Sequence, residues 1–159
     1  MLTLVTLLWG WMLTQEPSSA THVSNAELEA AFKQAIASNT IDTRVKTIAV
    51  EGGNATVAVL YRTKAETSAL IHDHVTEIYQ VKAGSGTLAT GGTLQNPQAI
   101  DLTRLGAGMS HTGTHVGGTS QQVKPGDVIV VPAGMPHRFS QLDGPIQYLV
   151  YRFEPASSR

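Results

Sequence analysis

From residue 45 onward the chain alternates short runs of β-branched and apolar residues with clusters of turn-forming residues. We expect strands at 45–50, 55–62, 68–74, 77–83, 86–90, 127–131, 136–141 and 146–153. Turn signals separate them, including Glu51-Gly52-Gly53-Asn54, Gly84-Ser85-Gly86, Lys124-Pro125-Gly126 and Asp143-Gly144-Pro145. Many short strands joined by regular turns indicate an all-β sandwich or barrel.

The stretch 92–122 does not follow this pattern. It is polar and rich in Gly and Thr, and we expect a long loop, of the kind that is usually functional or mobile. His111 and His115 lie in it. We interpret them as part of a mobile lid or as ordinary surface histidines.

One helix is predicted before the strands, over residues 25–37. Ser24 and Glu27 have the spacing of a capping box, in which each side chain meets the backbone N–H of the other residue. An apolar stripe with helical spacing follows, made of Leu28, Ala31, Phe32, Ala35 and Ile36. The stripe predicts that the helix lies against the barrel or against a partner subunit.

Composition excludes several classes of function. The 159 residues suffice for one domain, and the formal net charge of −1 leaves no cationic surplus for nucleic acid. Cysteine is absent, which excludes disulfides, zinc–thiolate sites and a cysteine nucleophile. Any metal site must therefore use imidazole and carboxylate groups.

The first twenty residues differ from the rest. An apolar run, Leu2 to Leu13, is too short for a membrane span of roughly 20 residues but suits a signal peptide, and Ser18-Ser19-Ala20 supplies small residues for cleavage. Because this segment has no Lys or Arg, an uncleaved apolar strand or a surface anchor is the alternative. We expect a signal peptide at 1–20, a helix and lead-in at 21–44 and a barrel at 45–159. The mature chain would be periplasmic or secreted, with no integral membrane span.

The first cluster of chemically active residues is His72-Asp73-His74-Val75-Thr76-Glu77. Side chains at i and i+2 of a strand leave the same face, so His72 and His74 are predicted to point together into the barrel and Asp73 outward. Glu77 has the opposite parity. It joins the same face only if Val75-Thr76 forms a tight turn and a new strand starts at Glu77.

The second cluster runs from Gly126 to His137. Within it, Pro132-Ala133-Gly134-Met135-Pro136 predicts a rigid turn that ends one strand and starts the next, with His137 at the first inward position. Three imidazoles and one carboxylate suit one divalent transition metal ion, namely Fe, Mn, Ni, Zn or Cu.

Together the two clusters resemble the paired cupin motifs, Gly-x5-His-x-His-x3–4-Glu-x6-Gly and Gly-x5-Pro-x-Gly-x2-His-x3-Asn. The second motif fits from Gly126 to His137, and Glu77 is followed by Gly84 at the family spacing. This chain has Glu66 where the first motif has Gly and Gln141 where the second motif has Asn. Only two residues separate His74 from Glu77, whereas the family motif has three or four. The resemblance implies a double-stranded β-helix, or jelly-roll barrel, with a metal inside it and commonly a homodimer.

The resemblance then implies that His72, His74 and His137 are metal ligands. Glu77 is interpreted as a fourth ligand, as a proton-transferring group, or as a carboxylate that hydrogen-bonds a ligand histidine.

Other residues are candidates for the walls of a substrate pocket. Tyr79 and Phe139 share strand parity with the expected ligands, although they could equally be core residues. Arg62 ends an apolar strand, where it would meet a substrate carboxylate or pair at the barrel rim. Gln141 and Tyr148 are candidate polar groups in the cavity.

Two hypotheses for function follow. The first is an exported, metal-dependent enzyme of dioxygenase or isomerase type, in which the metal acts on a small molecule as a Lewis acid or by activating oxygen. The alternative is a non-catalytic protein that binds a small ligand or a metal ion. A resemblance at the level of the fold does not choose between them.

Overall fold

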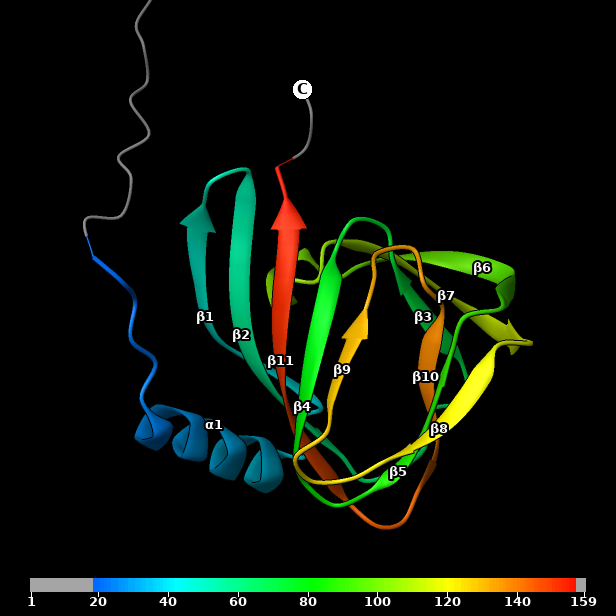
Figure 1. The fold of residues 1–159 in the computed structure, drawn as a ribbon, viewed down its shortest axis with the longest axis horizontal. Coiled ribbons are helices and arrows are strands. Elements are labelled where there is room, and N and C mark those ends of the chain that lie inside the picture. The colour runs from blue at the N-terminus through cyan, green and yellow to red at the C-terminus, as the bar shows by residue number, and fades with distance from the viewer. Residues whose placement is uncertain (1–18, 157–159) are drawn as a thin grey trace, which may run out of the picture.

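A computed structural model describes residues 19–156 of the chain. Two antiparallel sheets face each other, a five-stranded sheet in the order β1-β2-β11-β4-β9 and a six-stranded sheet in the order β6-β7-β3-β10-β5-β8 (Figure 1). The elements are α1 (Asn25–Ser38), β1 (Asp42–Val50), β2 (Gly53–Arg62), β3 (Ala69–His72), β4 (Thr76–Ala83), β5 (Gly86–Thr90), β6 (Thr93–Asp101), the 3₁₀ helix η1 (Thr103–Leu105), β7 (Met109–Val116), β8 (Thr119–Val123), β9 (Val128–Val131), β10 (His137–Leu142) and β11 (Ile146–Pro155). The predicted all-β jelly-roll with one N-terminal helix is confirmed.

The core lies between the two sheets. Its side chains come from strands of both sheets, among them Val81, Leu88, Phe139, Tyr148 and Val150, all of which are buried. In β4 burial alternates residue by residue up to Val81, as expected for a strand with one face toward the interior. This alternation aims Glu77 into the otherwise apolar interior, where an ionised carboxylate needs partners.

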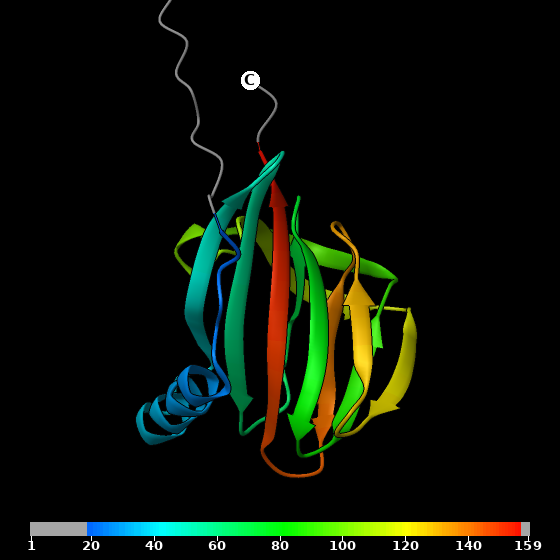
Figure 2. The same cartoon turned by 60° about the vertical axis from the view of Figure 1, so that its left-hand side comes forward.

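Helix α1 lies on the outer face of the five-stranded sheet (Figure 2). The capping box is present, since the Ser24 hydroxyl accepts from the Glu27 backbone N–H and the Glu27 carboxylate accepts from the Ser24 N–H. Phe32 is buried against Val59 and Leu149 of the sheet. Of the two positions predicted for the helix, the structure therefore has the one against the barrel.

The predicted long loop at 92–122 is wrong. It contains β6, β7 and β8, and β6 and β7 form a hairpin at the edge of the six-stranded sheet. Nearly every residue of β6 is exposed, so this strand has no buried face to impose an alternation of apolar and polar residues. The hairpin also contains a bulge between Gln95 and Gln98, which breaks the period of two.

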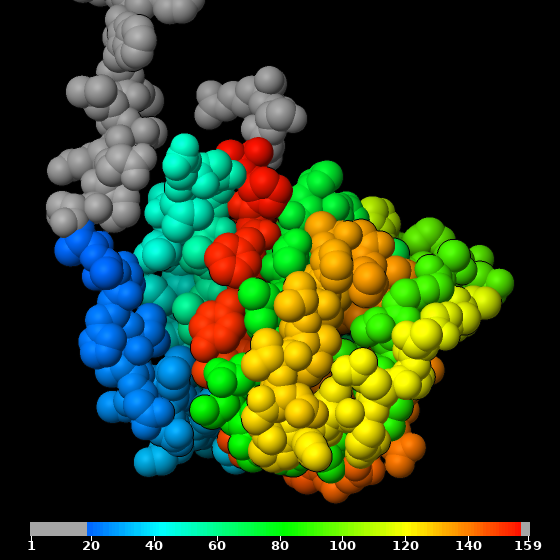
Figure 3. Space-filling model, viewed as in Figure 1, coloured from blue at the N-terminus to red at the C-terminus, as the bar shows by residue number. Residues whose placement is uncertain are grey.

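Some of the exposed apolar side chains outside α1 lie on β9 and β11, which are at the front of the space-filling view (Figure 3). Val128, Val130 and Phe153 are 60%, 58% and 47% exposed there. The homodimer stays a prediction.

At the N-terminal side the structure differs modestly from the expected boundaries. Strand β1 begins at Asp42, three residues before the expected start at 45. The predicted signal peptide falls almost entirely on residues 1–18, which lie outside the described part of the chain. Among the residues described, no helix is long and apolar enough to cross a membrane.

Candidate metal centre

Three buried side chains converge inside the barrel. His72 ends β3, Glu77 is the second residue of β4, and His137 begins β10, so both sheets contribute. The Oε2 atom of Glu77 lies 3.3 Å from Nε2 of His72 and 3.5 Å from Nε2 of His137. These residues are the group of potential metal ligands found in residues 19–156.

Hydrogen bonds on the far side of each ring fix which nitrogen faces Glu77. Nδ1 of His137 lies 3.0 Å from the Met135 carbonyl oxygen, which can only accept, so this nitrogen carries the proton. Nδ1 of His72 lies 2.8 Å from the Ser110 hydroxyl. That hydroxyl is within reach of the carbonyl oxygens of Ala107 and Gly108, and by donating to them it is left to accept from His72.

Both Nε2 lone pairs then point at a carboxylate oxygen. Three acceptor atoms this close repel one another unless a cation or a proton lies between them. Imidazole nitrogen and carboxylate oxygen bind Zn²⁺ tetrahedrally at about 2.0–2.2 Å, so neighbouring ligand atoms lie about 3.3–3.6 Å apart. The two observed distances, 3.3 and 3.5 Å, agree with this. Burial lowers the pKa of His137, against the opposing effect of Glu77, which favours the neutral imidazole that metals bind. The three residues therefore fit a divalent transition metal.

Glu77 is held by two further partners. Arg152 Nε donates to its Oε1 atom over 2.8 Å, and the Tyr79 hydroxyl donates to Oε2 over 2.6 Å. Burial opposes ionisation of this carboxyl, but the Arg152 guanidinium beside it outweighs the burial and holds its pKa well below the usual range. Glu77 is thus a carboxylate with one oxygen committed to Arg152 and the other turned to the histidines.

Arg152 is itself fully engaged. Its guanidinium, only 2% exposed, binds both carboxylate oxygens of Asp42 and the carbonyl oxygen of Leu105 as well as Glu77. Because Leu105 belongs to η1, the arginine also ties the segment between β6 and β7 to the centre. A buried guanidinium with this many acceptors is a rigid support for the Glu77 carboxylate.

The structure does not bring His74 to the centre. The expected alternation of His72 and His74 on one strand is wrong, because β3 ends at His72 and the chain turns to enter β4 at Thr76 in the other sheet. His74 is exposed in that turn. The same turn gives Glu77 its inward orientation. A turn before Glu77 was the condition under which the sequence predicted that Glu77 joins His72.

The turn also changes how the histidine motif aligns. Four residues separate His72 from Glu77. The family motif has three or four residues between its second histidine and its glutamate. His72 therefore occupies the second-histidine position and Leu70, two residues earlier on β3, occupies the first. Leu70 lines the inner cavity beside His72, so an apolar side chain stands where the motif has a ligand.

The other predicted pocket residues divide into two groups. Tyr79, Phe139 and Tyr148 are buried, and the Tyr148 ring packs at a tilt against each of the other two rings. Gln141 is exposed and hydrogen-bonds Asp143, because a bulge after Phe139 shifts the strand's alternation. It is not a cavity residue.

Arg62 lies at the edge of the cavity and is partnered by Tyr148 and Glu66. His111 and His115 lie on β7 rather than in a lid. They contact Asp73 and the Gly91 carbonyl oxygen respectively, so Asp73, predicted to point outward, has a partner on β7.

Sequence reasoning missed Arg152 and Ser110. Arg152 occupies the inward parity of β11 shared with Tyr148 and Val150, and an arginine at such a position was a usable signal of a buried charged partner. Ser110 lies in the segment interpreted as a loop, and no pattern in the sequence distinguishes it from its neighbours.

The inner cavity is small. It is about 40 Å³ in volume and is lined by His72, Glu77 and His137 together with Leu70 and Arg62 among others. That volume holds an ion with one or two water molecules. A larger ligand would have to bind outside this cavity and approach the three residues from there.

Comparison with known proteins agrees with this architecture. A family model described as AraC-like ligand binding domain matches residues 102–158, less than half of the chain. No curated protein matches at a significant level. A solved structure from Bacillus halodurans is similar over 89% of this chain and 87% of its own, with 18% identity and a TM-score of 0.52.

Two other solved structures are similar with lower scores. The DMSP lyase DddQ from Ruegeria pomeroyi matches with 18% identity over 91% of this chain and 70% of its own, at a TM-score of 0.48. A Klebsiella pneumoniae protein with a double-stranded β-helix domain matches with 11% identity over 76% and 83%, at a TM-score of 0.45. The two facing sheets and the paired motifs identify the chain as a small domain with the cupin fold.

Proposed function

We propose that the domain binds one divalent transition metal ion through Nε2 of His72, Nε2 of His137 and Oε2 of Glu77, and uses it to bind a small molecule. The observation that carries the proposal is the pair of anchored Nδ1 atoms, which leaves both Nε2 lone pairs facing a buried carboxylate. Two imidazoles and one carboxylate form a set of three protein ligands with positions left for water or a ligand.

The roles of the surrounding residues follow from their contacts. Ser110 and the Met135 carbonyl orient the two rings. Arg152 keeps Oε1 of Glu77 away from the centre, which favours coordination through one oxygen. A bound metal would supply a Lewis acid, or a site for activating oxygen, if the domain is an enzyme.

A second candidate is a binding domain without catalysis. The match to an AraC-like ligand binding domain supports it, as does the small inner cavity. A screen of the Fe, Mn, Ni and Zn forms against diketones, catechols and sugar acids separates the two. Turnover in any metal form favours the enzyme, and binding without turnover favours the alternative.

Elemental analysis of the purified protein tests the metal site. We expect about one transition metal ion per chain, lost in a His72→Ala/His137→Ala variant. His74→Ala is the matched control, since His74 lies two residues from His72 but is exposed, and it should keep the metal. Loss of metal in His74→Ala but not in the double variant would refute the assignment.

We further propose that the chain is exported, with cleavage after Ala20. The proposal is supported by the apolar run from Leu2 to Leu13 and the small residues before Thr21. Cell fractionation and N-terminal sequencing test it. A mature protein that begins at Thr21 outside the cytoplasm is expected, and an intact N-terminus in the cytoplasmic fraction would contradict it.

A further inference from the structure

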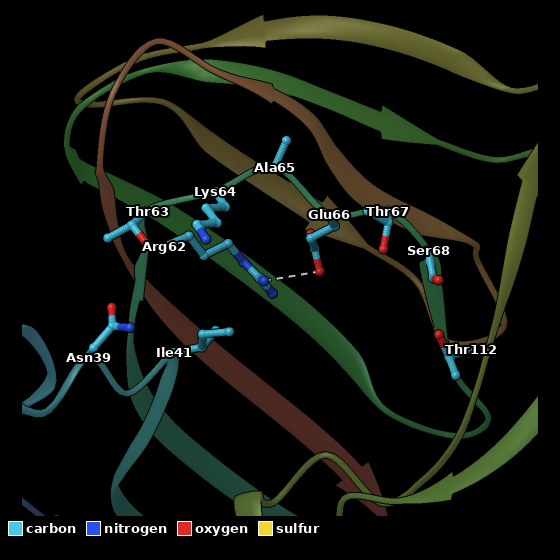
Figure 4. A pocket seen from close by; sticks show the side chains of 10 residues that line it. All are labelled: Asn39, Ile41, Arg62, Thr63, Lys64, Ala65, Glu66, Thr67, Ser68 and Thr112. Carbon is cyan, nitrogen blue, oxygen red and sulfur yellow. Dashed lines mark ion pairs between the residues drawn. The ribbon is translucent and has the colours of Figure 1, made fainter.

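A second, larger cavity lies outside the metal centre. It is a cleft of about 450 Å³ between the β2–β3 connection and the segment that leads from α1 to β1, closed at one end by β7 (Figure 4). Its lining residues are Asn39, Ile41, Arg62, Thr63, Lys64, Ala65, Glu66, Thr67, Ser68 and Thr112. The volume is in the range of small-molecule sites, which are commonly about 300–1,000 Å³.

The cleft carries a surplus of one positive charge. Arg62 and Lys64 supply two cations and Glu66 supplies one carboxylate, which pairs with Arg62 at 3.0 Å. Lys64 has no carboxylate within salt-bridge distance in the part of the chain that the structure describes. A ligand with one negative charge would balance the surplus.

The charged wall of the cleft is held rigidly. Arg62 Nε donates to the Tyr148 hydroxyl over 2.7 Å. Glu66 accepts from the Phe139 backbone N–H through Oε2, and its carbonyl oxygen accepts from Arg138. Because these bonds tie Arg62 to β11 and the β2–β3 connection to β10, Arg62 is oriented before any ligand arrives, which lowers the entropic cost of binding.

The remainder of the wall is rich in hydroxyl groups. Thr63, Thr67, Ser68 and Thr112 each contribute one, and Asn39 contributes an amide. In Figure 4 the Ser68 and Thr112 side chains lie at the end away from Arg62 and Lys64. Hydroxyls both donate and accept hydrogen bonds, so they match a ligand that itself carries hydroxyl groups.

The cleft also adjoins the metal centre. Arg62 and Glu66 line both the cleft and the inner cavity that contains His72, Glu77 and His137. We infer that the cleft is the ligand site of this domain and that it takes a small hydroxycarboxylate, with the carboxylate between Arg62 and Lys64 and the hydroxyls toward Ser68 and Thr112. The inference rests on the proposed function, because it names the class of small molecule that the domain would bind.

Binding of defined probes, followed by NMR shifts of the backbone amides of 62–68, tests the inference. D-gluconate carries a carboxylate and hydroxyls, sorbitol only hydroxyls, and hexanoate only a carboxylate. We expect gluconate to bind at least about fivefold more tightly than either of the others, since each lacks one set of contacts. Equal binding of sorbitol and gluconate, or tighter binding of inorganic phosphate, would overturn it.

Two substitutions test whether gluconate binds in the cleft. Lys64→Glu reverses an exposed charge and should weaken gluconate about five- to tenfold. Lys124→Glu, an exposed lysine in the turn before β9, is the matched control and should leave it unchanged. Equal affinities in the two variants would refute the role of Lys64.

Metal analysis and gluconate titration of the same wild-type protein separate this inference from the proposed function. Gluconate binding with no metal in the wild-type protein would refute the metal centre and leave the cleft. Metal binding with no response to gluconate in 62–68 would refute the cleft alone.

Discussion

Replacing Arg152 with methionine is the most informative perturbation of the centre. The guanidinium is 2% exposed and makes hydrogen bonds to Glu77, Asp42 and Leu105. Methionine keeps much of the volume but removes the charge, so the Glu77 carboxylate, 1% exposed, loses its cationic partner. Removing one member of a buried ion pair costs about 3–5 kcal/mol, which corresponds to a fall in Tm of roughly 6–20 °C for a domain of this size.

Urea and thermal denaturation of the metal-free protein measure the effect. Arg44→Met is the matched control, because Arg44 is exposed on β1 and its loss should change stability by less than about 0.5 kcal/mol. Adding Glu77→Gln to Arg152→Met should restore part of the stability, since the uncompensated carboxylate is then gone. A bound metal should likewise reduce the loss, because its charge replaces that of the guanidinium. If metal-free Arg152→Met is as stable as Arg44→Met, the reasoning about a buried charge is refuted.

Three further predictions concern single residues. Ser110→Ala should weaken metal binding about 10–100-fold by releasing the His72 ring, and a competition assay with a chelator would show no change if the hydroxyl is unimportant. Leu70→His should tighten Zn²⁺ binding by about tenfold or more by adding an imidazole on the inward face of β3; calorimetry that gives an unchanged Kd contradicts the alignment of the motif. Ser24→Ala should cost about 1 kcal/mol through loss of the cap, measured by denaturation, with an unchanged midpoint as the contrary result.

The parts of the fold that the sequence predicts correctly are those encoded locally. The period of two, the Glu51–Asn54 hairpin and the capping box at Ser24 each depend on a few neighbouring residues. The strands at 93–123 depend instead on pairing with distant partners, β7 with β3 and β8 with β5. Because their residues are mostly exposed, composition there resembles that of a loop.

The same distinction between local and long-range contacts explains which residues of the candidate site the sequence predicts. His137 follows a rigid turn, so its inward position is predictable from Pro132 to Pro136 alone. Whether His72 or His74 points inward depends on where β3 ends and the chain crosses to the other sheet, which local alternation does not specify. Arg152 reaches Glu77 across 75 residues of sequence through the pairing of β11 with β4. The inward parity of Arg152 indicates a buried charged partner, but which residue that partner is depends on the topology, which local sequence patterns do not specify.

The charges of the centre connect the metal to the ligand. Two carboxylates, of Glu77 and Asp42, face one guanidinium, of Arg152, so the metal-free cluster has one net negative charge. A divalent ion changes this to one net positive charge in a buried site, where an unbalanced charge is costly. A carboxylate ligand in the adjoining cleft reduces that cost, and the metal and the ligand should therefore strengthen each other's binding.

Thermodynamic linkage makes this coupling measurable from either side. The factor by which a bound metal lowers the Kd for gluconate must equal the factor by which gluconate lowers the Kd for the metal. Titrations of gluconate into metal-free and Zn²⁺-loaded protein, and of Zn²⁺ with and without gluconate, give the two factors independently. Lys64→Glu should reduce both factors together. Gluconate affinity that is the same with and without Zn²⁺ would mean that the cleft and the centre are independent sites, despite the two residues, Arg62 and Glu66, that line both.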